Sequence, residues 1–185
     1  MTVKPLNTEE LYLLKDLFSY NDPEEMIQSN SQKIESGEID IFGLFSNKVL
    51  IGELRAMYSN SDERFAQKGK RAYLYAFRIH KNHQGKGLGK HLLKYVIDNL
   101  TQNGYYEITV GVEDDNERAK HIYNSFGFDK IVSRIQEEYQ GEKYEYNLYL
   151  KSKRKGDAEA SPFLSSLKKI SPKGEIFSVL LLSLS

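Results

Sequence analysis

Apolar residues recur at helical spacing near the start of the chain and at strand spacing soon afterwards. Residues 2–6 fit a short strand, and residues 8–18 and 22–36 carry apolar side chains every three or four positions. Residues 39–45 and 48–57 are apolar runs separated by a short polar turn. The first third of the chain therefore predicts a strand, two helices and an antiparallel hairpin.

Residues 71–79 predict the central strand of a sheet. Simple alternation assigns Tyr73, Tyr75, Phe77 and Ile79 to one face, and the opposite face is apolar as well. A strand that is apolar on both faces is typical of a sheet covered on both sides. We therefore expect helices on both faces of this strand.

The second half of the chain predicts a parallel unit and a closing hairpin. Residues 88–100 have helical apolar spacing, and residues 105–112 alternate as a strand, so a right-handed strand–helix–strand crossover is expected. Residues 116–126 fit another helix, and residues 128–137 and 143–150 fit two antiparallel strands. The fold class is therefore α/β, with a mixed central sheet and helices on both faces.

A change of composition predicts where the domain ends. Residues 1–150 have the length and apolar content of one domain. Residues 151–185 begin with a basic linker and continue as a tail rich in Ser, Lys and Gly. We expect this tail to lie outside the fold, either as a non-native extension or packed on the domain or a neighbouring copy.

Composition excludes several classes of function. The 26 basic and 26 acidic residues balance, so total charge gives no case for nucleic acid or an anionic membrane. There is no cysteine and no metal-ligand pattern among the four histidines, so no metal is expected. The first five residues have no apolar h-region, so no signal peptide is expected, and the apolar stretch 176–184 is too short to span a bilayer. A cytoplasmic protein is expected.

A glycine-rich turn joins the predicted central strand to the following helix. Gly85, Gly87 and Gly89 let the backbone approach a ligand, and Lys86 and Lys90 add positive charge. A turn of this kind aims unpaired N–H groups and the positive end of a helix dipole at one point. The turn is therefore a candidate phosphate site, although a lone glycine cluster also fits an ordinary turn.

A second pattern follows about thirty residues later. It comprises Asn116, Ala119, Tyr123, Gly127 and Phe128. Taken alone, its Asn fits a helix cap and its Tyr a core residue. Together with Gln84-x-x-Gly87-x-Gly89 after a strand, however, this pattern resembles the GCN5-related N-acetyltransferase superfamily.

The resemblance implies an acyl-CoA site between two parallel strands that splay apart. The cofactor-binding residues that it implies are Phe77, Arg78, Ile79, Gln84, Gly85, Lys86, Gly87, Leu88, Gly89, Lys90, Asn116 and Tyr123. It further implies direct transfer of an acetyl group from acetyl-CoA to a primary amine, with Tyr123 protonating the leaving thiolate. Tyr139, Tyr144, Tyr146 and Tyr149 are expected to cover the sheet or line the acceptor pocket.

The general base is not fixed by the motifs. The central strand carries no carboxylate, which leaves Glu53, Glu113, Asp114 and His80 as candidates, with Glu53 ranked first. A water chain, or an amine that arrives neutral, would need no single base. A non-catalytic acyl-CoA-binding regulatory module and a phosphate-binding structural domain are the alternative functions. A homodimer is one expectation for the assembly.

Overall fold

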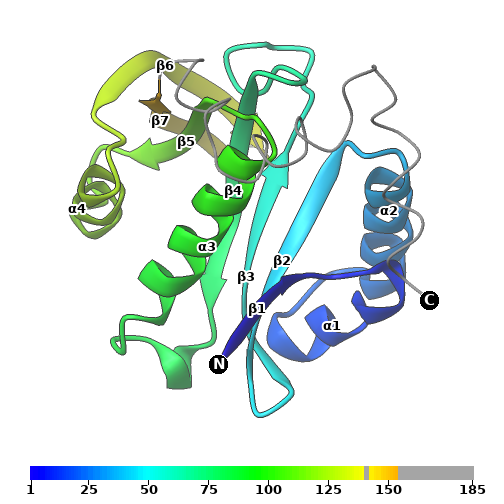
Figure 1. Cartoon of the computed structure of the whole chain (residues 1–185). Coiled ribbons are helices and arrows are strands. Elements are labelled where there is room, and N and C mark those ends of the chain that lie inside the picture. The colour runs from blue at the N-terminus through cyan, green and yellow to red at the C-terminus, as the bar shows by residue number, and fades with distance from the viewer. Residues whose placement is uncertain (140–141, 154–185) are drawn as a thin grey trace, which may run out of the picture.

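The computed structural model describes residues 1–139 and 142–153. Seven strands form one sheet in the order β1-β2-β3-β4-β5-β7-β6 (Figure 1). Their bounds are β1 Thr2–Pro5, β2 Ile39–Ser46, β3 Val49–Met57, β4 Arg71–Ile79, β5 Glu107–Glu113, β6 Lys130–Tyr139 and β7 Glu142–Ser152. The predicted mixed α/β sheet is confirmed.

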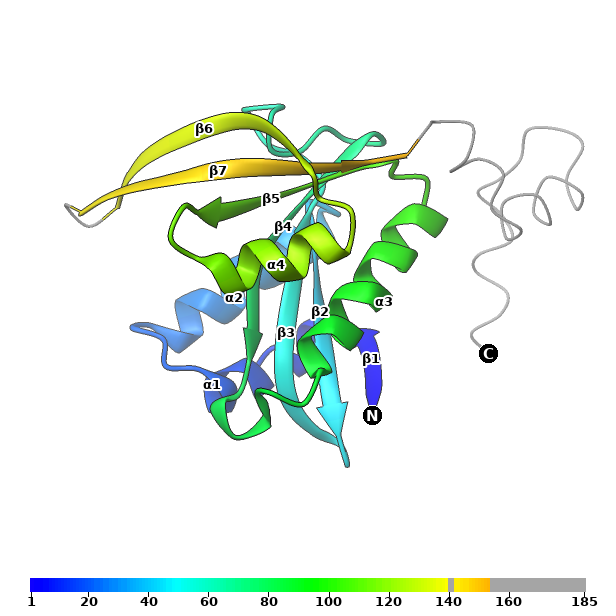
Figure 2. The ribbon, with the colours of Figure 1, turned by 90° about the vertical axis from the view of Figure 1, so that its left-hand side faces the viewer.

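Both faces of the sheet are covered by helices, as the apolar central strand predicted. The short α1 (Leu13–Leu17) and α2 (Pro23–Glu35) pack on one face through a core that includes Leu11, Leu14 and Ile41. The opposite face carries α3 (Leu88–Gln102) and α4 (Glu117–Ser125) over a second core. Figure 2 shows α2 and α3 on opposite sides of the sheet.

The first predicted helix is shorter and broken. A 3₁₀ turn, η1 (Thr8–Glu10), is capped by the Asn7 side chain, which accepts a hydrogen bond from the Glu10 backbone N–H at 2.9 Å. The α-helical turns begin only at Leu13. The capped segment is thus a single 3₁₀ turn that is separate from α1. The apolar spacing alone did not reveal this interruption between the two segments.

The parallel pair β4 and β5 separates partway along its length. The two strands are paired from Arg71 and Glu107 to Leu74 and Val110. Beyond that point β4 continues to Ile79 and β5 to Glu113 without pairing to each other. In Figure 2, β5, β7 and β6 run across the direction of β2 and β3. The fork between β4 and β5 is the splayed pair that the family resemblance implied.

A bulge in β4 changes which side chains share a face. Ala76 has φ +50°, and the pairing with β3 shifts register there. As a result Phe77 and Ile79 pack with the core beneath α3, whereas Tyr73 packs on the other side. The prediction that all four aromatic and aliphatic residues lie on one face was wrong, because a one-residue bulge inverts the alternation.

The last strand continues past the predicted end of the domain. β7 extends to Ser152, and the Lys151 ammonium donates to the Phe126 carbonyl at 2.7 Å. The start of the predicted basic linker is therefore part of the sheet. The tail from residue 154, including the apolar stretch 176–184, lies outside the described residues. In the part described, no helix combines the length and apolar character needed to cross a membrane.

Candidate functional site

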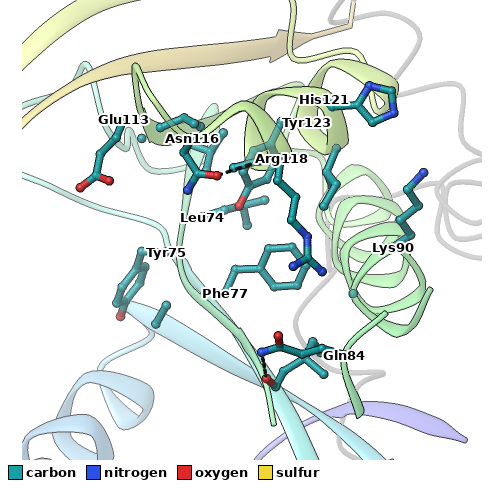
Figure 3. A pocket seen from close by; sticks show the side chains of 18 of the residues that line it. Leu74, Tyr75, Phe77, Gln84, Lys90, Glu113, Asn116, Arg118, His121 and Tyr123 are labelled. Atoms are coloured by element: carbon teal, nitrogen blue, oxygen red, sulfur yellow. Dashed lines mark hydrogen bonds between the residues drawn. The ribbon is translucent and has the colours of Figure 1, made fainter. Parts of the chain in front are cut away.

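A cavity of about 880 Å³ lies at the fork between β4 and β5. Its walls come from the unpaired ends of these strands, the first turn of α3 and the inner side of α4. Tyr146 of β7 and Glu137 of β6 complete it. Figure 3 shows the side chains from α3, α4 and both strands that surround this space. The cavity therefore joins the glycine turn to the closing hairpin.

The glycine turn has the backbone features of an anion site. Gly85 and Gly87 both have φ +75°, a conformation that favours glycine. Gly87 is the N-cap of α3 and provides no side-chain acceptor, so the N–H groups of the first helical turn are left for a ligand. Lys90 lines the same end of the cavity. Helix dipole, open N–H groups and a cation together fit a phosphate or pyrophosphate.

Most of the predicted cofactor-binding residues line this cavity. They are Phe77, Ile79, Gln84, Gly85, Gly87, Leu88, Gly89, Lys90, Asn116 and Tyr123. Gln84 also has a local role, because its amide donates to the Ile79 carbonyl at 2.8 Å and so ties the turn to the end of β4. This contact is visible in Figure 3.

Two predicted cofactor-binding residues lie away from the cavity wall. The Lys86 ammonium donates to the Asn82 carbonyl at 3.0 Å, within the turn itself. Arg78 faces the side of α1 and α2, where its guanidinium lies 4.0 Å from the centre of the Phe18 ring. The β4 bulge explains the position of Arg78, since it sends Arg78 to one face and its neighbours to the other.

Asn116 begins α4 at the edge of the cavity. Its side-chain oxygen accepts a hydrogen bond from the Ala119 backbone N–H at 3.0 Å, drawn in Figure 3. This is the N-cap interaction that the sequence indicated. Because the oxygen is engaged and the residue lines the cavity, its amide N–H₂ is the group available to a ligand.

Tyr123 lies between the sheet and the cavity. Its ring packs against those of Phe77 and Phe128, with centroid separations of 6.3 and 5.4 Å. Among the residues that the structure describes, none hydrogen-bonds its hydroxyl. Burial raises the pKa of Tyr123 well above the usual value of a phenol. The side chain is therefore a protonated hydroxyl held inside the cavity.

Glu53 is placed behind the site rather than in it. Its carboxylate is 0% exposed and accepts from the Arg55 Nε at 2.8 Å and from the Arg78 guanidinium. It does not line the cavity. Both carboxylate oxygens are engaged by guanidinium groups outside the cavity, so Glu53 has no contact with an amine bound there. Its geometry favours a structural role, in which it balances the charges of Arg55 and Arg78.

The other sequence candidates for a base differ in accessibility. Glu113, at the end of β5, lines the cavity. Asp114 is held by Arg134 and Asn147 and faces a neighbouring hollow. His80 accepts from the Asn82 backbone N–H at 3.4 Å within η2 (Lys81–His83). Only Glu113 among these four candidates reaches the cavity wall.

Sequence reasoning did not single out several residues of the cavity wall. These are Tyr73, Tyr75, His83, Arg118, His121 and Glu137. Arg118 and His121 were detectable in principle, because they occupy the same helix as Asn116 and Tyr123. Tyr146 was among the tyrosines expected at an acceptor pocket, and it does line the cavity. Tyr144 borders the neighbouring hollow, and nothing is described of the Tyr139 side chain.

Within residues 1–139 and 142–153, no group of three or more His, Asp or Glu side chains is arranged to hold a metal ion. The ligand-binding features of the cavity are instead an anion site at one end and tyrosines with carboxylates at the other. The fold and cavity together define an α/β protein with a cavity between two forked parallel strands and features of an anion site at one end. The sequence model of the Acetyltransferase (GNAT) family matches residues 8–128, and the chain belongs to this family.

Curated relatives match only part of the chain. The L-amino acid N-acyltransferase MnaT of Escherichia coli (strain K12) is 40% identical over 50 residues, which are 27% of this chain and 29% of that protein. A probable spermine N(1)-acetyltransferase of Bacillus subtilis subsp. natto (strain BEST195) is 34% identical over 90 residues, 46% of this chain and 57% of that protein. The matches thus span less than two thirds of either relative.

Solved structures match over a larger part of the fold. A spermidine N-acetyltransferase SpeG chimera from Vibrio cholerae and hSSAT has a TM-score of 0.67 at 20% identity and covers 85% of this chain and 98% of that chain. The yncA acetyltransferase of Salmonella typhimurium, solved with acetyl-CoA, has a TM-score of 0.64 at 17% identity, over 82% and 93%. At these identities the likeness establishes the fold.

Proposed function

We propose that the protein transfers an acetyl group from acetyl-CoA to a primary amine. The observation that carries this proposal is the fork between β4 and β5, which has an anion site at one end and the Tyr123 hydroxyl inside it. The length and chemistry of this cavity suit a pyrophosphate followed by an extended thioester arm. Membership of the GNAT family supports the same assignment.

Each part of the acetyl donor has a matching group on the chain. The N–H groups of Gly87 to Lys90 bind the pyrophosphate. The backbone of Phe77 and Ile79, no longer paired with β5, forms strand-like hydrogen bonds with the pantetheine amides. A β4 N–H beyond Leu74 also stabilises the oxyanion of the tetrahedral intermediate. Tyr123 supplies a proton to the departing sulfur.

The acceptor end of the cavity favours an amine that carries positive charge. Glu113 and Glu137 line this end together with the aromatic side chains of Tyr73, Tyr75 and Tyr146. Carboxylates attract an ammonium group, and aromatic faces bind cations. The names of the relatives include L-amino acid, spermine and spermidine acetyltransferases, all of which act on amines. These amines form the first panel to test.

Acetyl-CoA is expected to raise the melting temperature, because a ligand that binds only the folded state stabilises it. At a hundred times its dissociation constant the gain is about 2.7 kcal/mol. Gly87→Glu places a bulky acid at a φ of +75° in the anion site and should abolish this shift. Gly69→Glu is the matched control, since Gly69 has φ +72° but does not line the cavity.

Release of free CoA with the amine panel then tests catalysis, and Tyr123→Phe is expected to lower kcat by about 100-fold. A wild-type protein that binds acetyl-CoA yet turns over no amine would support the non-catalytic module instead. Absence of a thermal shift at saturating acetyl-CoA would refute the proposal that acetyl-CoA is the acetyl donor.

A cytoplasmic location and a homodimer stay predictions, to be checked by cell fractionation and by the molar mass in solution.

A further inference from the structure

Tyr146 lies at the point where β4 and β5 separate. Its ring covers Gly111, the first residue of β5 beyond the last pair with β4. A Cβ atom at Gly111 would approach the Tyr146 ring to 2.8 Å and the Tyr73 hydroxyl to 3.4 Å. The missing side chain of Gly111 therefore makes room for Tyr146, and two phenol groups face the fork where the thioester is expected.

The Tyr146 hydroxyl is bonded to a carboxylate on the neighbouring strand. It donates to Glu137 Oε1 at 2.7 Å, and both residues line the cavity. In the part of the chain that the structure describes, no Lys, Arg or His forms an ion pair with Glu137. Glu137 thus differs from Glu53, whose charge is balanced by two guanidinium groups.

The neighbours of this pair keep its phenol protonated. Burial, followed by the hydrogen bond to Glu137, raises the pKa of Tyr146. Burial and the charge of Glu137 raise the pKa of Tyr73 to about 12. Glu113 faces the pair from β5, and Tyr144 is the cross-strand neighbour of Glu137 on β7. Its hydrogen-bonded and cross-strand neighbours are therefore tyrosines, and among the described residues no ion pair neutralises the charge of Glu137.

We propose that Tyr146 and Glu137 remove the proton from the acceptor ammonium, an assignment that rests on the acetyltransferase function proposed above. The ammonium gives a proton to the Tyr146 oxygen while Tyr146 passes its own proton to Glu137. Tyr146 is the catalytic residue of this pair because it faces the reacting amine, and Glu137 acts through it as the final acceptor. Both carboxylate and phenol are restored when Glu137 releases the proton to solvent.

The protons and electrons of the transfer then balance. The nitrogen lone pair forms the C–N bond, the C–S bond breaks, and its electron pair leaves with sulfur. Tyr123 protonates the sulfur, and the second amine proton replaces the one that Tyr123 gave. One proton is released for each acetyl group transferred, as the conversion of an ammonium and a thioester into an amide and a thiol requires.

The test uses the full chain and four variants with spermine, spermidine and L-amino acids as acceptors. Glu137→Gln and Tyr146→Phe should lower kcat at neutral pH by about 100-fold. The thermal shift caused by acetyl-CoA should be unchanged, because neither residue belongs to the anion site. Glu138→Gln is the matched control on the opposite face of β6 and should stay within about twofold of wild type. Glu113→Gln tests the rival carboxylate.

The pH dependence separates proton removal from a structural role. The loss in Glu137→Gln should shrink as the pH approaches the amine's own pKa, about 10.4 for a lysine-like amine, because the amine then arrives neutral. A loss that is constant with pH, activity within about threefold of wild type, or a comparable loss only in Glu113→Gln would overturn the assignment. Wild type that binds acetyl-CoA but acetylates none of the amines would overturn both this assignment and the proposed function.

Discussion

Glu53 and Glu137 show how the immediate partners of a carboxylate determine what it can do. Glu53 is fully buried and holds Arg55 and Arg78 on the face covered by α1 and α2. Glu137 is exposed at the cavity and holds only a phenol among its described contacts. The first carboxylate is enclosed by two cations, whereas the second is open to the cavity.

Glu53→Gln is therefore expected to destabilise the fold more than it impairs the chemistry. Removing one charge of a buried ion pair leaves the other charges uncompensated and costs about 3 to 5 kcal/mol. Urea unfolding should show this loss, while kcat measured well below the melting temperature should change little. Asp98→Asn is the control, since it breaks the exposed pair with Lys94 and should cost less than about 1 kcal/mol. A stable Glu53→Gln protein with greatly reduced kcat would contradict this view.

Ala76 is the residue whose conformation the sequence did not reveal. Its φ of +50° is rare for alanine and costs about 1 to 2 kcal/mol. Apolar residues occur on both faces of β4, so the hydrophobic pattern fits either register and carries no sign of the bulge. The bulge nevertheless directs Phe77 into the cavity and Arg78 away from it.

At the scale of elements, α4 depends on Asn116 for both its start and its ligand-facing edge. Asn116→Asp keeps a side-chain oxygen for the Ala119 N–H, so the cap and the stability should be preserved. The same change replaces an amide N–H₂ with a negative oxygen beside the cavity and should weaken acetyl-CoA binding by about tenfold.

Asn116→Ala is the comparison for this prediction. It removes the cap as well as the amide. It should therefore lower the free energy of unfolding by about 1 kcal/mol and also weaken the affinity for CoA. Calorimetric titration with CoA and thermal unfolding measure the two effects separately. If Asn116→Asp bound CoA as tightly as wild type, Asn116 would be a helix cap and no more.

Strong periodicity explains which elements were predictable. α3 has five buried residues on one face, and its apolar spacing predicted it well. Residues 8–18 gave a weaker signal, because a 3₁₀ turn and a short helix place Leu11 and Leu14 in the same core without a continuous helix. The anion end of the site follows from one strand, one turn and one helix that are adjacent in the sequence, so it could be anticipated.

At the scale of the whole molecule, the acceptor end combines segments that are far apart in the chain. Tyr73 comes from β4, Glu113 from β5, and Glu137 and Tyr146 from the closing hairpin. Their meeting depends on the placement of β7 beside β5, which sequence spacing does not determine. Most residues that the sequence assigned to the donor end line the cavity, although Arg78 and Lys86 do not, whereas Glu137 required the structure.

Buried tyrosine hydroxyls occur on both faces of the sheet. Because of them, we expect the folded protein to lose stability at alkaline pH. Burial raises the pKa of Tyr58 and of Tyr123, and it raises the pKa of Tyr73 to about 12. In the unfolded chain each phenol ionises near pH 10. Their contribution is therefore complete below pH 10 and is lost as the pH rises toward the folded values.

By pH 11 the contribution of each of these three tyrosines to the free energy of unfolding should have fallen by about 1.4 kcal/mol, and their joint contribution by roughly 4 kcal/mol. The melting temperature should accordingly fall by about 10 °C between pH 9 and pH 11. Tyr73→Phe should reduce the alkaline loss by about 1.4 kcal/mol, because the contribution of one buried phenol is gone. Tyr12→Phe, which removes an exposed hydroxyl, should not change it. An equal pH dependence in Tyr73→Phe and wild type would show that the Tyr73 hydroxyl ionises as freely in the folded protein as in the unfolded chain.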